Sequence, residues 1–287
     1  MKKITILLLF FTFCLAASGC DGKKEPEEQK TIRVLYADWA GTFAMTHLAK
    51  YILEERMGYK IYLTPGDVNT IYVSLARGEY DFFMGAWLPK THKRYYYHYD
   101  SKLDNLGPNY HGAKTGLAVP DYVTINDITE LGPNSGNFGG KIVGIETGAG
   151  IINNTSEAQR VYGFNLNIET NNEKTMLDKL DEAIKRNEWI VITGWRPHWM
   201  FSRYNLKFLD DPKKIFGEIE TINTISRKGL RKSNPVLYKF LKNFSLNNEQ
   251  MESLLEDFHY LPGNPTQAAK NWASKNNDVV NSWIPED

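Results

Sequence analysis

The sequence contains very little cysteine. Among its 287 residues only Cys14 and Cys20 carry a thiol, and both lie near the N-terminus. From residue 21 onward the chain cannot form a disulfide, a thiolate nucleophile or a cysteine-ligated metal site. The glycine-rich phosphate loop, the His-Glu-x-x-His motif and the Gly-x-Ser-x-Gly elbow are absent too. The sequence therefore lacks the common signatures of enzymes, and we expect no catalysis and no cofactor.

An excess of charge is also missing. Lys and Arg number 34, the same as Asp and Glu, and without Lys2 and Lys3 a slight acidic excess remains. Such a chain offers no basic surface of the kind that nucleic acids require, so we expect no nucleic-acid partner. His92 and His98 flank a basic, aromatic run, but their spacing is not that of a helical ligand pair. We therefore predict no metal site.

Long apolar runs are missing except at the N-terminus. Residues 4–17 are uncharged but too few for a comfortable membrane span. They follow two lysines and precede small residues that end at Cys20, which resembles a bacterial lipoprotein signal. Residues 1–19 are predicted to be a signal peptide, Cys20 the lipidated residue and residues 20–30 a charged tether. Simple cleavage and secretion remains the alternative, because Ala17 stands where such signals more often have Leu.

The remainder of the chain alternates between strand and helix patterns. A first βαβαβ unit is predicted from strands at 31–37, 59–63 and 80–84 and helices at 43–57 and 67–77. A second unit is predicted from strands at 141–145, 165–169 and 190–193 and helices at 150–162 and 173–186, and the chain from residue 235 is helical. Extended segments near 114–119 and 221–227 connect the two units. The predicted fold is α/β, a two-lobe clamshell of the periplasmic-binding-protein type (type II-like) with the ligand between the lobes. Lobe I comprises residues 31–114 and 227–287, and lobe II comprises 115–226.

Three tryptophans stand at the ends of predicted strands. Trp39, Trp87 and Trp195 each follow an apolar strand, the position where open α/β sheets present ligand-binding groups. Several indole faces around one site suit a quaternary ammonium group, which has no N–H to donate. The other tryptophans are expected to pack in the core (Trp189, Trp272 and Trp283) or beneath the site (Trp199).

A possible anion site lies in the second unit. The Gly148–Gly150 segment separates a strand from a helix, so the amides of Gly150 and Ile151 are free at the positive end of the helix dipole. His92 could add a side-chain N–H. The alternatives are an ordinary glycine turn and, for His92, a surface-facing start of a helix.

These residues belong to segments that carry a family resemblance. AWLPKTHKRY at 86–95, IETGAGI at 145–151 and ITGWRPHWMFSRYNLKFLDDPKK at 192–214 resemble glycine betaine-binding lipoproteins of osmoprotectant ABC importers. The resemblance covers nearly the whole chain after the tether. It implies that a trimethylammonium group is boxed by Trp39, Trp87 and Trp195. It further implies that the ligand carboxylate is held by the amides of Gly150 and Ile151 and by His92. Arg196 departs from the small polar residue expected there.

The resemblance implies a monomeric receptor, anchored to the outer face of the membrane by its lipid, that delivers a betaine to an ABC permease. Two rivals stay open. A choline receptor would keep the tryptophan box but would need no carboxylate site. A sugar-binding lipoprotein or glycosidase would stack its ligand on tryptophan and would require acidic residues beside the indoles. The sequence does not rank glycine betaine, proline betaine, carnitine and dimethylsulfonioacetate.

Overall fold

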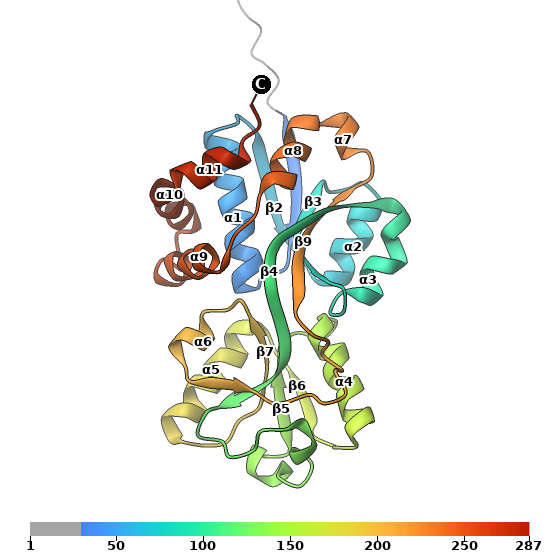
Figure 1. Ribbon diagram of the computed structural model, residues 1–287, viewed down its shortest axis with the longest axis vertical. Helices are drawn as coiled ribbons and strands as arrows, with labels where there is room; N and C mark the ends of the chain where they lie inside the picture. Colours follow the sequence, from blue (N-terminus) through green and yellow to red (C-terminus); the bar gives the residue numbers. More distant parts are fainter. Residues whose placement is uncertain (1–29, 287) are drawn as a thin grey trace, which may run out of the picture.

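The protein is described here by a computed structural model covering residues 30–286. The predicted signal peptide, Cys20 and all of the tether except Lys30 lie outside the described residues. Two lobes lie one above the other and are connected by strands β4 (Leu103–Pro120) and β9 (Glu220–Arg227), which run side by side through the middle of the molecule (Figure 1). This is the two-lobe α/β architecture that the sequence predicts.

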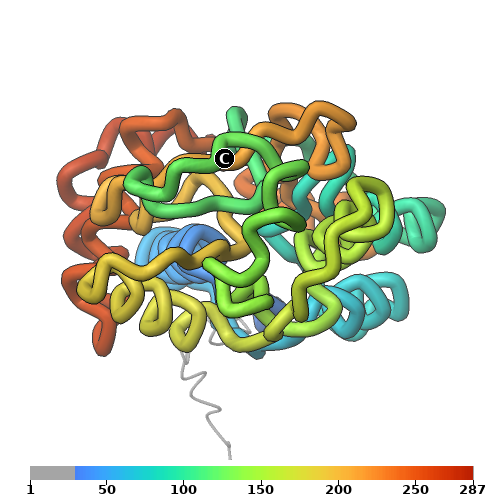
Figure 2. The backbone as a smooth tube through the Cα atoms, turned by 90° about the horizontal axis from the view of Figure 1, so that it is seen from below, coloured from blue at the N-terminus to red at the C-terminus, as the bar shows by residue number. Residues whose placement is uncertain are grey.

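Lobe I begins with the predicted βαβαβ unit. Its elements are β1 (Thr31–Tyr36), α1 (Ala40–Glu55), β2 (Lys60–Pro65), α2 (Val68–Ala76), β3 (Phe82–Leu88) and α3 (Lys93–Tyr99). The C-terminal helices α7 (Leu230–Ser233), α8 (Pro235–Asn243), α9 (Asn248–Tyr260), α10 (Pro265–Lys275) and α11 (Asn277–Trp283) complete it. β1 pairs in parallel with both β2 and β3. Figure 2 shows α9, α10 and α11, in red, on the side of the molecule opposite α2 and α3, in cyan.

Burial explains why these segments adopt their structures. Every residue of β3 is buried, as is typical of a central strand covered on both faces. In α1, Met45, Leu48, Ala49 and Ile52 are buried at helical spacing and pack the helix on the sheet. α2 begins after Asp67, whose side chain accepts a hydrogen bond from the Thr70 amide at 2.9 Å.

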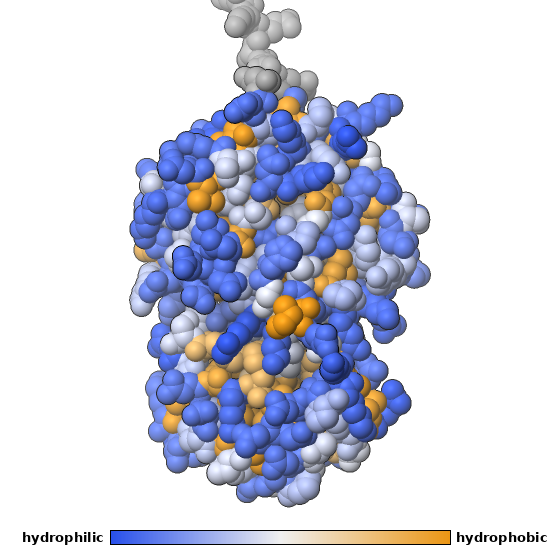
Figure 3. Space-filling view, viewed as in Figure 1, coloured by the Kyte–Doolittle hydropathy of each residue, from blue (hydrophilic) through white to orange (hydrophobic). Residues whose placement is uncertain are grey.

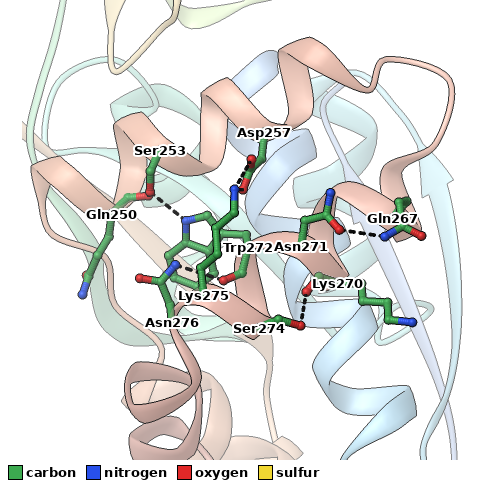
Figure 4. Close-up of polar contacts among 10 residues, drawn as sticks. All are labelled: Gln250, Ser253, Asp257, Gln267, Lys270, Asn271, Trp272, Ser274, Lys275 and Asn276. Carbon is green, nitrogen blue, oxygen red and sulfur yellow. Dashed lines mark hydrogen bonds and ion pairs between the residues drawn. The ribbon is translucent and has the colours of Figure 1, made fainter.

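The C-terminal helices pack through a buried pair of tryptophans. The indole rings of Trp272 and Trp283 are stacked with their centroids 6.0 Å apart, and both are buried, as predicted. Figure 4 shows the Trp272 Nε1 donating to Ser253 Oγ of α9, at 2.9 Å. The same view shows Lys275 Nζ paired with Asp257, at 2.8 Å. These contacts hold α9 and α10 together at the side of lobe I.

Lobe II contains the second α/β unit. Its elements are β5 (Lys141–Gly144), α4 (Gly150–Tyr162), β6 (Asn167–Thr170), α5 (Glu173–Arg186), β7 (Ile192–Arg196), α6 (Met200–Arg203) and β8 (Leu206–Phe208). β5 pairs in parallel with β6 and β7. The bounds of α4 and α5 agree with the prediction. β8 was not predicted, because three residues provide too short a pattern to recognise.

β4 belongs to both lobes, a feature that its local sequence does not indicate. From Leu103 to Ala113 it pairs with β9, and from Lys114 to Pro120 it pairs with β7 and β8. The strand order is therefore β2-β1-β3-β9-β4-β7-β5-β6. Only residues 114–119 of β4 were predicted as extended, because Gly107, Pro108 and Gly112 interrupt the strand pattern before them. The lobe boundaries stay a prediction, and the antiparallel pairing of β9 with β3 favours a second boundary before Glu220 over one after residue 226.

The outer surface is mainly hydrophilic on the face drawn in Figure 3, with hydrophobic side chains visible where the lobes meet and on the lower lobe just beneath. No helix within residues 30–286 has both the length and the apolar character needed to cross a bilayer. Within the same residues no three metal-ligating side chains come together.

Candidate functional site

A cavity lies between the lobes. Its volume is about 290 Å³ when the space at its open mouth is included. All six residues that the sequence proposed for ligand contact line it. The complete lining consists of Trp39, Trp87, Thr91, His92, Thr115, Ile145, Ala149, Gly150, Ile151 and Trp195. Residues far apart in the chain therefore meet at one small site, and the chemistry of each determines what the site can bind.

The three tryptophans come from both lobes. Trp39 is the N-cap of α1 and Trp87 lies in β3, whereas Trp195 lies in β7 of lobe II. Each indole is 7% exposed or less, so little water reaches the ring faces. Desolvated indole faces attract a cation by about 2 kcal/mol or more each.

The predicted location of two of these indoles past a strand end was wrong. β3 continues to Leu88 and β7 to Arg196, so Trp87 and Trp195 are the penultimate residues of their strands. Strand pairing explains the extension, since Trp87 lies opposite Ile222 of β9 and Trp195 opposite Thr115 of β4. The ladder thereby fixes both backbones at the cavity more firmly than a turn would.

Two backbone amides of lobe II are free to donate hydrogen bonds to a ligand at the cavity. Gly150 and Ile151 are the first residues of α4, and the N-cap Ala149 provides no side-chain hydrogen bond. Neither amide has a hydrogen-bond acceptor among residues 30–286. Free N–H groups at the positive end of a 13-residue helix provide a site for a carboxylate.

Gly150 also permits the lobes to approach. A Cβ atom added at this position would lie 2.2 Å from the Thr91 carbonyl oxygen and 2.7 Å from its Cγ2. No side chain fits at such a distance, so this contact between lobe II and lobe I requires glycine. The glycine turn is therefore part of the closed arrangement rather than an ordinary connection.

His92 is a buried donor that faces the cavity. Its side chain is 0% exposed, so the surface-facing alternative is wrong. Nδ1 accepts a hydrogen bond from the Trp87 amide at 3.2 Å, which assigns the proton of the neutral ring to Nε2. Burial lowers the pKa of His92 to about 3, and Nε2 is buried without a partner among the described residues. The neutral ring thus presents an unused N–H hydrogen-bond donor to the site.

Glu220 supports the loop that carries these groups, and sequence reasoning did not identify it. Its carboxylate accepts hydrogen bonds from the amides of Lys90 and Thr91, at 2.6 and 2.9 Å, and from the Thr91 hydroxyl. Glu220 is 2% exposed and starts β9. No local pattern marks it, because its partners are about 130 positions earlier in the chain.

Two further carboxylates lie across the cleft from Trp39. Glu146, in the loop before α4, accepts a hydrogen bond from the Trp39 Nε1 at 2.8 Å. Glu173, the first residue of α5, accepts one from the Ala40 amide at 3.1 Å. Burial raises the pKa of Glu146, the Trp39 hydrogen bond opposes this change, and the charges of Glu173 and Asp38 add to it. These bonds connect lobe II directly to the loop of lobe I that holds one indole of the cage.

The segment after Trp195 forms a supporting layer. The His198 ring lies edge-on to the Trp195 ring at 4.9 Å, and its Nε2 bonds to Glu173 at 3.1 Å. His198, rather than Trp199, therefore packs against the cage. The Trp199 ring contacts the His259 ring of lobe I in a tilted arrangement, with the ring centroids 4.2 Å apart. The Trp199 ring also lies 5.2 Å from the His198 ring, so it approaches the cage only through His198, and its predicted place beneath the site stays a prediction.

Arg196, where the sequence analysis expects a small polar residue, is not among the residues that line the cavity. Its guanidinium lies over the Phe201 ring at 4.4 Å, with Phe208 at 5.9 Å. Its guanidinium therefore forms cation–π contacts within lobe II.

Comparison with known proteins gives a consistent result. The family model described as the substrate binding domain of the ABC-type glycine betaine transport system matches residues 30–275. A glycine betaine/carnitine transport binding protein of Listeria monocytogenes is 41% identical over 146 residues, which are 50% of this chain and 48% of that protein. The matched segment thus spans about half the length of this curated relative.

Two solved structures are similar over most of the chain. The lactococcal OpuAC in its closed conformation with glycine betaine is 36% identical, with a TM-score of 0.84, covering 90% of this chain and 100% of that one. An ABC-transporter choline binding protein in complex with choline is 27% identical, with a TM-score of 0.81, covering 90% and 93%. Because the family model covers nearly all of the described residues, the chain belongs to the family of substrate-binding domains of ABC-type glycine betaine transport systems.

Proposed function

We propose that this protein is an extracytoplasmic receptor that captures glycine betaine or a related betaine and delivers it to an ABC permease. The observation that carries the proposal is the convergence of two kinds of group on one cavity. Trp39, Trp87 and Trp195 present indole faces, and the Gly150 and Ile151 amides and His92 Nε2 present unpaired donors. A zwitterion with a quaternary ammonium at one end and a carboxylate at the other uses both sets.

The receptor binds its ligand without changing it. Cation–π attraction and charge-assisted hydrogen bonds provide the affinity, and closing of the lobes removes water from both. Binding energy that is available only in the closed form shifts the population of conformers toward it. The permease partner, the monomeric state and the absence of catalysis are parts of the same proposal.

The choline alternative requires a cation cage but no anion site. Choline carries a hydroxyl where betaine carries a carboxylate, so it would leave the charge-stabilising capacity of the amides and of His92 largely unused. The sugar-binding and glycosidase alternatives require carboxylates turned toward the ligand. Glu146 stands beside an indole, as those alternatives demand, but its Oε1 is occupied by the Trp39 N–H. These considerations favour a betaine.

The test is calorimetric titration with glycine betaine, proline betaine, carnitine, dimethylsulfonioacetate, choline and a disaccharide. We expect a betaine to bind more tightly than choline and the disaccharide not to bind. Equal or tighter binding of choline would support the choline receptor. Binding of the disaccharide alone would support the sugar-binding alternative.

Membrane anchoring at Cys20 is a further part of the proposal. Acyl chains on this residue would keep the receptor near its permease, with residues 20–30 as the tether. Replacement Cys20→Ser is expected to release a soluble or unprocessed protein, detectable by membrane fractionation. A processed variant that remains in the membrane fraction would contradict the anchor.

A further inference from the structure

The indole of Trp39 differs from the other two in its hydrogen bond to an acid. Its N–H donates to Glu146 Oε1 at 2.8 Å, from one lobe to the other. Among the described residues neither Trp87 nor Trp195 donates its indole N–H to a carboxylate. One wall of the cage is therefore held in place by a hydrogen bond to an acidic side chain of the other lobe.

The surroundings of Glu146 screen its charge weakly when the carboxyl is ionised. The side chain is partly buried, so water screens it incompletely. Burial raises the pKa of its carboxyl, as do the charges of Glu173 and Asp38, whereas the Trp39 hydrogen bond favours the ionised form. Among residues 30–286, no Lys or Arg forms an ion pair with it. A cation arriving on the indole face would supply the missing positive charge.

We propose that Glu146 determines the preference of the cavity for a cationic headgroup. Its carboxylate holds the Trp39 ring across the cleft and adds negative charge to the edge of that ring. An indole whose N–H donates to an anion carries more negative charge on its faces, and a cation there is also attracted directly by the carboxylate. Glu146 is thus a positioning and specificity-determining residue, and the inference rests on the proposed betaine function.

A simpler role would be that of a clasp that only holds the lobes together. A clasp would increase the affinity for every ligand that closes the cleft, whatever the charge of the ligand. The electrostatic role acts on charge and leaves the shape of the site unchanged. The two roles are separated by ligands of one shape and different charge, used together with variants that remove the charge but keep the hydrogen bond.

Glycine betaine and 3,3-dimethylbutanoate form such a pair, because a quaternary carbon replaces the quaternary nitrogen in the second. The variant Glu146→Gln keeps an oxygen that accepts the Trp39 N–H but removes the charge. Glu146→Ala removes both. Glu157→Gln is the matched control, since Glu157 also crosses the cleft, to Lys90 Nζ at 3.5 Å, but contacts no cage indole.

The experiment is calorimetric titration of both ligands at low and moderate salt, using competition against glycine betaine for the weaker one. We expect Glu146→Gln to weaken glycine betaine about tenfold and to leave 3,3-dimethylbutanoate unchanged or stronger. Glu146→Ala should weaken glycine betaine further, and Glu157→Gln should leave the ratio of the two affinities unchanged. An unchanged ratio of the two affinities in Glu146→Gln, whether both fall equally or neither changes, would overturn the inference while leaving the betaine function intact. Failure of the wild-type protein to bind any betaine would instead overturn the proposed function and this inference with it.

Discussion

The two ends of the ligand cavity are built from different parts of the polypeptide. The cation end consists of side chains, the indoles of Trp39, Trp87 and Trp195. The anion end consists mainly of main-chain amides at the start of α4, assisted by His92. Substitution can therefore remove the cation end one ring at a time. At the anion end it can remove the His92 side chain, but the two amides can be disturbed only by moving the backbone or blocking access to them. Variants at each end test this contrast.

The largest effect is expected at Gly150. A methyl group in Gly150→Ala would collide with the Thr91 carbonyl oxygen, 2.2 Å from the position of the added Cβ. The lobes could then not close, and we expect glycine betaine affinity to fall about a thousandfold because the competent state becomes rare. Titration measures this loss, and Gly136→Ala is the control because nothing lies within 4 Å of its added Cβ. Near wild-type affinity of Gly150→Ala would show that this contact does not limit closure.

Removal of one cage ring should have the next largest effect. Each of Trp39→Ala, Trp87→Ala and Trp195→Ala is expected to weaken betaine binding by about 1–3 kcal/mol, measured by titration. Trp283→Phe is the control, since Trp283 is buried in the packing of the C-terminal helices away from the cavity. Equal losses at all four positions would indicate general destabilisation and not a cage.

The anion end should respond more selectively. His92→Ala is expected to lower glycine betaine affinity by about one to two decades, because a charge-assisted hydrogen bond is lost while the two amides remain. Choline, which carries no anion, should be nearly unaffected. Both ligands are titrated against wild type and variant in one buffer. A similar loss for both would remove the carboxylate assignment and favour the choline receptor.

The smallest effect concerns stability. The pKa of His92 is about 3 in the folded protein and about 6.5 when unfolded, so only the unfolded chain takes up this proton between these values. The free energy of unfolding therefore keeps its full value well above pH 6.5 and decreases as the pH falls. The decrease due to His92 is about 1.4 kcal/mol at pH 5.5. Urea unfolding at pH 7.5 and 5.5 measures the sum of this decrease and that of His47, whose pKa burial lowers to about 4, and the difference between wild type and His92→Gln isolates the part due to His92. His92→Gln should show a correspondingly smaller pH dependence, and an unchanged dependence would mean that His92 titrates normally.

The sequence predicted those parts of the site that can be recognised from a local pattern of residues. Strand and helix periodicity located the elements of both lobes, and the tryptophans and the glycine turn are recognisable because each lies next to an element boundary. Glu146 and Glu220 were not predicted as parts of the site. Their partners, Trp39 and Thr91, are 107 and 129 positions away, and only the packing of the lobes brings them together. The extension of β3 and β7 through their tryptophans likewise depends on partner strands.

The membership of β4 in both sheets has a consequence for how tightly a small ligand can be held. Because the strand passes from one ladder to the other between Ala113 and Lys114, the two half-sites are never separate molecules. When a ligand has bound to one lobe, the other lobe is already present at an effective concentration of at least millimolar order. This holds for any two binding sites that are joined by a short linker. Closing is therefore an intramolecular step, and little translational or rotational entropy is lost in it. The contacts of the second lobe can thus contribute almost their full strength to retaining a ligand of only a few heavy atoms.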